Sequence, residues 1–266
     1  MAETCVLIKG GGDLASGVAH KLFNCGMKVV ITEAEKPTCV RRAVSFAEAV
    51  YEGRAEVEDV VALGVADAAG AEAAWEGNTI PVLVDPAARI KSELKPDVIV
   101  DAIMAKRNTG TKITDAPIVI ALGPGFTAGE DVHAVVETNR GHNLGRVIYR
   151  GEAEPNTHTP GPISGYAEER VLRAPQLGIF TASRIIGDLV KAGETVGSVA
   201  EASVTARISG VVRGLIHEGV TVRQGQKLGD IDPRSKREYC FTISDKSRCI
   251  AGSVLEAILS LRRKRL

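Results

Sequence analysis

The stretch "CVLIKGGGDLASGVAHKL", residues 5–22, decides the fold that we expect for this chain. Its apolar start is typical of a buried strand, and three glycines separate that strand from Leu14, Val18 and Leu22, which recur at helical spacing. The run "KVVIT", residues 28–32, then predicts a second strand. A strand, a glycine turn, a helix and a strand within about 30 residues are the context in which a GxGxx(G/A) match indicates a dinucleotide-binding turn.

Apolar strands and helical stretches continue to alternate through the first half of the chain. Four further β-like runs are separated by Ala- and Glu-rich helical stretches: "VALGV", "IPVLVD", "DVIVDAIM" and "PIVIAL". This alternation indicates a mostly parallel sheet that is covered on both faces. We therefore expect an α/β fold, with a Rossmann-like doubly wound, mostly parallel sheet over residues 1–155 and a binding site beyond the carboxyl ends of its strands.

The glycine turn predicts a site for phosphate. Gly10, Gly12 and Ala15 occupy the three fingerprint positions, and the turn leads into a helix N-terminus with free N–H groups and a positive partial charge. Glu33, at the end of the second strand, is placed to accept hydrogen bonds from a ribose diol. Asp13 complicates this interpretation, because a carboxylate in the first helical turn is favoured by the dipole and competes for the same amides. A nucleotide site and a purely structural turn therefore both stay open.

Charged residues follow two of the predicted strands. Arg41 and Arg42 lie just beyond the second strand and predict contact with a second phosphate, although a solvated helix start explains them equally well. Asp101 ends a later strand. Lys106 and Arg107, in the loop that follows, predict a second anion contact, with an ordinary solvated loop as the alternative.

Two glycines and two histidines complete the candidate residues. Gly123 and Gly125 follow another predicted strand, where they either let the backbone approach a ligand or form a rigid turn fixed by Pro124. His142 is a candidate acid or base, although a lone histidine is more often a structural residue. His158 has no second ligand at metal-binding spacing, so no metal site is expected.

Charge and cysteine content argue against several classes of function. Lys plus Arg and Asp plus Glu both number 33, so the zero net charge gives no electrostatic case for nucleic acid or a membrane surface as a partner. The five cysteines match neither a CxxC nor a Cys/His zinc spacing, which favours free thiols in a reducing compartment. The chain has neither a leader-like start nor an apolar stretch of about 18 residues, so we expect a cytoplasmic protein.

The second half of the chain contains a repeat. Residues 172–199 align without a gap with residues 204–231, and four pairs of glycines coincide in this alignment. The pattern "GDxVxxGxxVGxV" resembles one half of biotinyl and lipoyl carrier domains, which implies a β-rich barrel-sandwich hybrid over residues 156–266, ending in a C-terminal helix. Two such copies bury each other's apolar faces. The joining residues 200–203, "AEAS", lack the lysine that those carriers modify, which argues against a swinging-arm carrier.

A second resemblance covers nearly the whole chain. Seven motifs occur in order from residue 9 to residue 234: "KGGGDLASGVAHKL", "ITEAEKPTCVRRAVSFAEAVYEG", "DAIMAKRNTGT", "ALGPGFTAGEDVHAVVETNRGHNLGRVIYRG", "PNTHTPG", "ISGVVRGLI" and "KLGDIDPR". In these motifs the chain resembles the YqeB-type accessory proteins of selenium-dependent molybdenum hydroxylases. The resemblance implies a role in maturing xanthine-dehydrogenase-like enzymes, with the client hydroxylase and other cofactor-maturation proteins as partners. It supplies no catalytic residue to carry over.

The residues and the resemblance together favour an accessory protein that binds a nucleotide-bearing cofactor such as a molybdopterin dinucleotide. That cofactor carries a pyrophosphate and a ribose, which the glycine turn and Glu33 suit, while the four Arg and Lys residues named above neutralise the remaining charge. One alternative is an oxidoreductase that uses an NAD(P)-like dinucleotide, with His142 or Asp101 transferring a proton. Another is an interaction module with a vestigial pocket. Whether the chain forms a homo-oligomer stays open.

Overall fold

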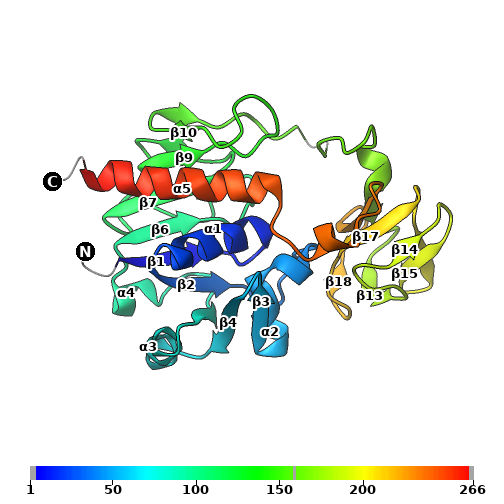
Figure 1. Cartoon of the computed structure of the whole chain (residues 1–266), viewed down its shortest axis with the longest axis horizontal. Helices are drawn as coiled ribbons and strands as arrows, with labels where there is room; N and C mark the ends of the chain where they lie inside the picture. Colours follow the sequence, from blue (N-terminus) through cyan, green and yellow to red (C-terminus); the bar gives the residue numbers. More distant parts are fainter. Residues whose placement is uncertain (1–3, 158–159, 264–266) are drawn as a thin grey trace. The chain divides into compact units, whose positions relative to one another are not determined.

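The computed structural model describes residues 4–157 and 160–263, and its contacts divide the chain into two units (Figure 1). Unit 1 comprises Met1–Glu35, Phe46–Asn156 and Ile243–Leu266, and unit 2 comprises Lys36–Ser45 and Thr157–Thr242. This division differs from the expected domains in two places, because the segment after Glu35 groups with unit 2 and the C-terminal segment groups with unit 1. No helix in the described part of the chain is long and apolar enough to cross a membrane.

Unit 1 is built on a nine-stranded mixed sheet with the order β10-β9-β7-β6-β1-β2-β5-β4-β3. Its strands are β1 (Cys5–Lys9), β2 (Lys28–Glu33), β3 (Arg54–Val57), β4 (Val60–Val65), β5 (Ile80–Val84), β6 (Val98–Asp101), β7 (Ile118–Leu122), β9 (Ala134–Val136) and β10 (Val147–Ile148). The strands from β9 to β4 in this order are parallel, and β10 and β3 pair antiparallel at the two edges. The strand order reverses at β1, because β2 and β5 lie on one side of it and β6 and β7 on the other. The short strands β8 (Thr127–Ala128) and β11 (Gly151–Glu152) form a separate pair.

Helices α1 (Asp13–Asn24) and α5 (Asp245–Arg263) lie side by side over one face of this sheet (Figure 1). Gly17 allows their close approach, because a Cβ at this position would lie 2.0 Å from the Oγ atom of Ser247. The Ser247 hydroxyl donates a hydrogen bond to the carbonyl oxygen of Asp13 at 2.9 Å. The N-terminal end of α5 is therefore fixed beside the N-terminal end of α1.

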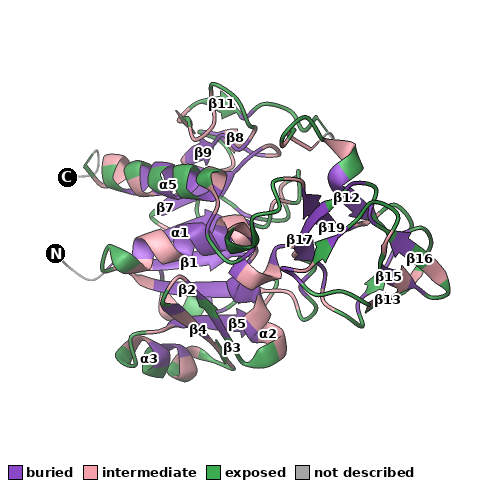
Figure 2. Cartoon of the chain, turned by 45° about the vertical axis from the view of Figure 1, so that its right-hand side comes forward, coloured by how far each residue is buried: buried purple, intermediate pink, exposed green. Residues whose placement is uncertain are grey.

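The opposite face of the sheet is covered by shorter elements, namely α3 (Ala68–Glu76), α4 (Lys91–Leu94) and the loops beside them. Trp75 and Leu94 pack against a buried cluster of strand residues, and the Trp75 indole N–H donates to Val29 O at 2.8 Å. The remaining short helix of unit 1, α2 (Ala49–Glu52), follows a single 3₁₀ turn. With both faces covered, the central strands β1 and β2 are buried along most of their length (Figure 2).

The expected fold class, a Rossmann-like doubly wound sheet followed by a barrel-sandwich hybrid, is wrong. The sheet of unit 1 is mixed, and residues 102–117, which join β6 to β7, contain no helix. The C-terminal helix α5 contacts β7, β9 and β10 instead, so this part of the sheet is not covered by successive crossover helices. Unit 2 consists of two separate small antiparallel sheets, and the C-terminal helix is not part of it.

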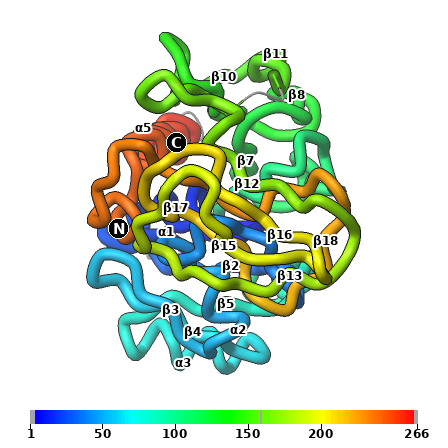
Figure 3. Tube along the Cα trace, turned by 90° about the vertical axis from the view of Figure 1, so that its right-hand side faces the viewer, coloured from blue at the N-terminus to red at the C-terminus, as the bar shows by residue number. Residues whose placement is uncertain are grey.

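Unit 2 contains two four-stranded sheets with the orders β12-β19-β17-β14 and β16-β15-β13-β18. The path of the chain through β12, β13, β15, β16, β17 and β18 can be followed in Figure 3. The first consists of β12 (Val171–Arg173), β19 (Lys227–Asp232), β17 (Gly210–Leu215) and β14 (Leu189–Val190). The second consists of β16 (Ala202–Thr205), β15 (Thr195–Val199), β13 (Gly178–Ala182) and β18 (Thr221–Val222). All neighbouring strands in both sheets pair antiparallel.

The sequence repeat corresponds to a reciprocal exchange of hydrogen bonds within unit 2. The Gly187 amide donates to Val212 O at 2.8 Å. Its counterpart Gly219 donates at 2.9 Å to Phe180 O, and Phe180 is the counterpart of Val212. A second set of counterparts makes the same exchange. The Gly193 amide donates to Ala206 O, and the Gly225 amide donates to Ala174 O, each at 2.8 Å. All four glycines have positive φ angles, between 78° and 99°. Each copy thus supplies the acceptors for the other copy's turns.

Candidate functional site

The candidate site lies in unit 1 at the carboxyl ends of β1 and β6, where the strand order reverses. In open α/β sheets this crevice is the usual place for a ligand. The glycine turn after β1 begins with Gly10, whose φ of +90° favours glycine. A Cβ on Gly10 would lie 3.1 Å from Ala102 O, so the turn after β1 packs directly on the turn after β6. Of the predicted cofactor-binding residues, all except Arg41 and Arg42 lie in unit 1.

Glu33, at the end of β2, binds the glycine turn itself. Its Oε2 atom accepts the Gly11 N–H at 2.7 Å, and its Oε1 atom accepts the Ala34 N–H at 2.7 Å. The Gly11 carbonyl in turn accepts the Ala47 N–H at 2.9 Å. The carboxylate therefore holds the turn in place, and binding of a ribose by its remaining lone pairs stays a prediction.

The first turn of α1 offers amide groups to a ligand. The first backbone hydrogen bond of this helix runs from Ser16 N–H to Gly12 O at 2.8 Å. Among the described residues, none accepts a hydrogen bond from the amides of Gly12, Leu14 or Ala15. No described hydrogen bond joins these amides to the Asp13 carboxylate. Competition of Asp13 for these amides stays a prediction.

Asp101 belongs to a buried polar cluster rather than to an open surface. Lys9, at the end of β1, donates from Nζ to Thr111 Oγ1 at 2.5 Å, and that hydroxyl donates to Asp101 Oδ2 at 2.6 Å. The Lys9 ammonium also lies 3.4 Å from the same carboxylate oxygen, and the two side chains are 8% and 2% exposed. This cluster ties Thr111, in the second half of the β6–β7 loop, to the ends of β1 and β6. Sequence reasoning missed Lys9 and Thr111, although a lysine at the end of an apolar strand was a usable signal.

Gly123 and Gly125 are explained by contacts within the protein. A Cβ on Gly125, which has a φ of +105°, would lie 2.6 Å from the backbone of Arg107. A Cβ on Gly123, with a φ of +71°, would lie 2.6 Å from Thr138 Oγ1. The loops after β6, β7 and β9 are thus layered on one another through glycines. Backbone approach to a ligand at these two glycines stays a prediction.

Two lysines stand near this crevice. Lys106 lies in the loop after β6 with a φ of +63°, a conformation that is unfavourable for a residue with a side chain. Burial lowers its pKa. Lys246 is the second residue of α5, and burial lowers its pKa, with the attraction of the Asp13 carboxylate as the largest opposing effect. Sequence reasoning missed Lys246 because it assigned the C-terminal helix to the second domain. Arg107 is exposed.

Arg41 and Arg42 lie in unit 2, where they hold the segment 36–45. Arg41 Nη2 donates to the carbonyl oxygens of Tyr239 at 3.0 Å and Thr242 at 3.3 Å, and Arg42 Nε donates to Leu215 O at 3.0 Å. These bonds give both arginines a structural role. The structure does not group them with the glycine turn, so their predicted phosphate contact gains no support.

His142 does not join the site. His142 is exposed, in the segment between β9 and β10. His158 lies outside the described residues.

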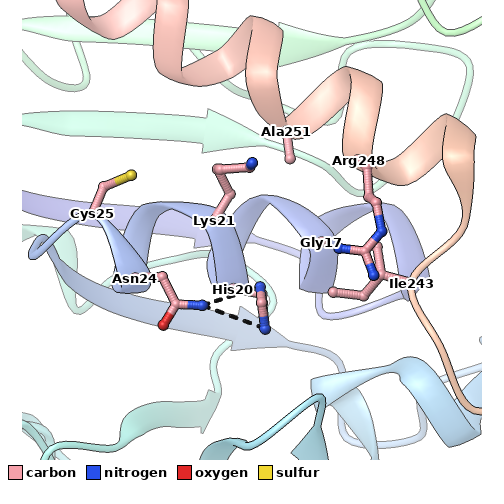
Figure 4. A pocket seen from close by; sticks show the side chains of 8 residues that line it. All are labelled: Gly17, His20, Lys21, Asn24, Cys25, Ile243, Arg248 and Ala251. Atoms are coloured by element: carbon pink, nitrogen blue, oxygen red, sulfur yellow. Dashed lines mark hydrogen bonds between the residues drawn. The ribbon is translucent and has the colours of Figure 1, made fainter.

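A shallow groove between α1 and α5 is separate from the strand ends (Figure 4). It is lined by Gly17, His20, Lys21, Asn24, Cys25, Ile243, Arg248 and Ala251. The His20 ring contacts Asn24 Nδ2 at 3.4 Å and Glu58 O at 3.2 Å, and Arg248 is paired with the Glu58 carboxylate. These polar groups are engaged with one another, which fits a contact between helices better than a ligand site.

Comparison with known sequences gives a clear relative. No family model matches the chain. Over 256 residues it is 50% identical to a protein of Escherichia coli (strain K12) named "Uncharacterized protein YqeB". The chain is a homologue of YqeB. The alignment covers 96% of the chain, which spans about half of the relative's length (47%). The resemblance to YqeB-type sequences is thus confirmed, whereas the role in molybdenum hydroxylases stays a prediction.

Solved structures give weaker likenesses. The chain is similar to an aspartoacylase family protein from Mesorhizobium loti (TM-score 0.27, 11% identity) and to a succinylglutamate desuccinylase/aspartoacylase from Rhodobacter sphaeroides (TM-score 0.28, 14% identity). It is also similar to the ectoine utilization protein EutE (DoeB) from Ruegeria pomeroyi (TM-score 0.26, 13% identity). Each match covers 86% of this chain and 85% of the other. At such low TM-scores these neighbours carry no argument about function.

Proposed function

We propose that this chain is an accessory protein in the maturation of selenium-dependent molybdenum hydroxylases, and that unit 1 binds a nucleotide-bearing cofactor such as a molybdopterin dinucleotide. One observation carries the binding part: the amides of Gly12, Leu14 and Ala15 begin α1 without acceptors among the described residues, beside the crevice between β1 and β6. Such amides, together with the helix dipole, favour a phosphate group. The hydroxylase part rests on the resemblance of the chain's motifs to YqeB-type accessory proteins.

The roles follow from the placement of each group. The turn from Gly10 to Gly12 and the amide of Ala15 bind the pyrophosphate. Glu33 accepts ribose hydroxyls with the lone pairs that Gly11 and Ala34 leave unused, because each carboxylate oxygen receives one backbone hydrogen bond. Binding and delivery of a cofactor need no general acid or base from this chain.

The alternative, an NAD(P)-dependent oxidoreductase, is less well supported by the same contacts. Asp101 is 2% exposed and bound to Thr111 and Lys9, so it cannot readily exchange a proton with a substrate. His142 is exposed and follows β9, which is separated from β1 by β7 and β6 in the order of the sheet. The arrangement favours binding over hydride transfer with an internal proton donor.

Ligand identification tests the binding part. Protein purified from cells that make molybdenum cofactor is examined by native mass spectrometry, and its thermal unfolding is measured with NAD, NADP, cytidine nucleotides and the isolated cofactor. We expect co-purification of a nucleotide-bearing mass and an increase in Tm with the cofactor. Stabilisation by NADP alone would contradict the accessory role and support the oxidoreductase.

A matched pair of variants locates the ligand. Gly12→Asp places a second carboxylate at the N-terminus of α1 and should abolish the ligand-induced increase in Tm. Gly252→Asp makes the same change in α5, where a Cβ would meet no atom within 4 Å, and should preserve the increase. An unchanged increase in Gly12→Asp places the ligand elsewhere.

The maturation part is tested in cells. Deleting the gene should lower the activity of a selenium-dependent molybdenum hydroxylase without lowering the amount of hydroxylase protein. Gly252→Asp should restore that activity and Gly12→Asp should not. Full hydroxylase activity in the deletion strain would contradict the proposed role.

A further inference from the structure

We propose that unit 2 carries a docking surface for an acidic protein segment with apolar side chains. The centre of this surface, called here the Gly187 patch, consists of Ile185, Leu189 and Phe241, and the cations of segment 234–237 lie beside it. The surface is independent of the proposed function, because it concerns a partner of unit 2 and not the ligand of unit 1. Its exposure, its absence from the other copy of the repeat and its charge support the proposal.

The patch brings together large apolar side chains that remain in contact with water. Ile185 and Leu189 lie on either side of Gly187, in the turn that leads into β14, and they are 63% and 66% exposed. Two hydrogen bonds close this turn: the Asp188 N–H donates to Ile185 O at 3.2 Å, and the Ile185 N–H donates to the Asp188 carboxylate at 3.0 Å. Exposed apolar residues that occur together and are surrounded by polar residues mark interaction surfaces.

Phe241 joins the patch from a distant part of the chain. A Cβ on Gly187 would lie 3.1 Å from Phe241 Cζ and 3.0 Å from Arg237 Nε, so the segment that carries these two side chains packs on the turn. The Val212 carbonyl accepts the Gly187 N–H at 2.8 Å and the Cys240 S–H at a sulfur–oxygen distance of 3.6 Å. Both segments are therefore fixed at the same point of β17, and Phe241, which is 41% exposed, lies beside the turn.

The other copy of the repeat shows that the turn forms without apolar side chains. Gly219 is the counterpart of Gly187, and its amide makes the corresponding hydrogen bond at a φ of +82°, against +99° for Gly187. The residues two positions before and after it are polar, His217 and Thr221. A Cβ on Gly219 would meet no described atom within 4 Å, so no aromatic ring packs on this turn. Folding of the turn thus does not explain the apolar residues of the Gly187 patch.

Positive charge lies next to the patch. The Arg237 guanidinium lies 5.4 Å from the centre of the Phe241 ring. Among the described residues, neither Arg237 nor Lys236 forms an ion pair within 4 Å. Segment 234–238 carries three cations and one acid, in a chain whose charges sum to zero, and the acid of the turn, Asp188, already accepts a backbone N–H. A partner with carboxylates beside apolar side chains therefore complements this surface in both charge and apolar contact.

The composition of the patch favours such a protein segment over nucleic acid or a second copy of the chain. Single-stranded nucleic acid is bound by stacking of its bases on aromatic rings, whereas two of the three patch residues are aliphatic. A two-fold contact between two copies of the patch would bring the cations of segment 234–237 of both copies toward one another. Carboxylates from a different protein avoid this repulsion.

The test selects binders of the full chain from a displayed library of random dodecapeptides and measures the affinity of an enriched peptide by fluorescence anisotropy. We expect enriched peptides to combine several acidic residues with Leu, Ile, Phe or Trp. The double variant Ile185→His/Leu189→Thr, called here the swap variant, gives the turn the side chains of its counterpart and should weaken binding about tenfold or more. Arg237→Gln should weaken binding about threefold, and added salt should weaken binding to the wild type.

Leu177→Ser is the matched control. Leu177 is 68% exposed, its counterpart in the second copy is Ser209, and it precedes β13, at the opposite end of that strand from the Gly187 turn. The control should bind the peptide as tightly as the wild type does. The control and the swap variant should both unfold within about 3 °C of the wild type, because substitutions of exposed residues change stability little.

Several outcomes would overturn the docking surface. They are a library that yields no binder, enriched peptides that lack carboxylates, and peptides that bind the swap variant as tightly as the wild type. A Tm of the swap variant clearly below that of the control would give Ile185 and Leu189 a structural role instead.

Two further measurements distinguish the other possible occupants. A wild-type dimer that the swap variant does not form, measured by sedimentation velocity, would identify a second copy as the occupant and overturn the proposal. Binding of a labelled RNA that depends on Arg237 and not on the swapped residues would do the same in favour of nucleic acid. Nucleotide binding by unit 1 enters none of these measurements, so the proposed function stands or fails separately.

Discussion

Glu58, in the turn between β3 and β4, accepts hydrogen bonds from Arg248 of α5 at 2.6 and 2.7 Å, one on each carboxylate oxygen. The same carboxylate accepts the Ile243 N–H at 2.8 Å. The β3–β4 turn therefore holds the start of the C-terminal segment, at Ile243 and Arg248, by hydrogen bonds. Burial acts to raise the pKa of Glu58, but the hydrogen bonds from Ile243 and Arg248 outweigh it and leave the pKa below its ordinary value.

These hydrogen bonds to the Glu58 carboxylate predict a contribution to the free energy of unfolding that is lost in acid. Because the folded-state pKa of Glu58 is lowered, its contribution is present above the pKa of the unfolded chain and is lost as the pH falls through the folded-state pKa. Glu58→Gln should lower the free energy of unfolding by about 1 kcal/mol at pH 7, a value reduced for partial solvent exposure. The difference from wild type should shrink as the pH is lowered below about 4.

Urea unfolding at several pH values checks this expectation. Glu56→Gln is the matched control, since Glu56 lies in β3 of the same hairpin and pairs with Arg54 on the exposed surface. If Glu58→Gln lowers the free energy of unfolding no more than Glu56→Gln does, the hydrogen bonds of Glu58 to Ile243 and Arg248 do not stabilise the protein.

The buried cluster of Lys9, Thr111 and Asp101 predicts a large and coupled effect. Lys9→Met leaves the Asp101 carboxylate buried without its cation, which should cost about 3–5 kcal/mol. Asp101→Asn in the Lys9→Met background should recover part of that loss, because no unpaired charge is left. Arg54→Met, which breaks an exposed pair, should cost about 1 kcal/mol or less. Denaturant unfolding of the wild type, Lys9→Met, Asp101→Asn and the double variant gives the coupling energy, and additive losses would refute it.

The contact between the loops after β6 and β7 predicts that Gly125→Ala costs more stability than its positive φ angle alone would cause. Gly125→Ala places a Cβ 2.6 Å from the Arg107 backbone, so the loop that carries Lys106 must move. Gly110→Ala has a similar φ, +111°, but its Cβ would meet nothing within 4 Å. We expect Gly110→Ala to cost about 1 kcal/mol and Gly125→Ala at least twice as much, as measured by thermal unfolding. Equal losses would mean that the loops are not in contact.

Thiol chemistry provides a test of burial in unit 1. Burial, and then the nearby Asp97 carboxylate, raise the pKa of Cys5 to about 11 against a smaller opposing effect of Lys28. Roughly one molecule in a thousand then carries the reactive thiolate at pH 8. Cys25, which is exposed, should react first with iodoacetamide, and Cys5 should react only after unfolding. Peptide mass spectrometry after timed labelling checks the order, and early labelling of Cys5 would contradict it.

Local patterns predicted the parts of the site that are close in sequence. The apolar spacing located α1 and its start at the glycine turn, and the position of Glu33 beside that turn was predicted as well. The hydrogen-bond partner of Glu33 was not predicted, because the fingerprint assigns this carboxylate to a ribose, whereas here it accepts the N–H of Gly11. Two of the four glycine pairs of the repeat have positive φ angles, a local requirement that favours glycine: Gly187 with Gly219, and Gly193 with Gly225. The barrel-sandwich hybrid that the repeat predicted is wrong, because these strands form two separate antiparallel sheets.

Contacts between distant segments were beyond such patterns. Nothing near Lys246 indicates that its helix packs on α1, because the decisive contact is the fit of Ser247 into the space that Gly17 leaves. The mixed edges of the sheet were also missed. The hairpin of β3 and β4 turns at Glu58 and Asp59 with φ angles of 45° and 68°, without the glycine that normally marks such a turn.

The return of α5 to unit 1 has a consequence for the order of events during synthesis. The surface of α1 that α5 covers stays uncovered until residues 243–263 have left the ribosome, after all of unit 2. Ser247 arrives with them, so a chain that stops earlier holds the glycine turn without the Ser247 contacts to Asp13 and Gly17. The start of α1 therefore gains its full set of packing contacts only when translation of the C-terminal helix is complete.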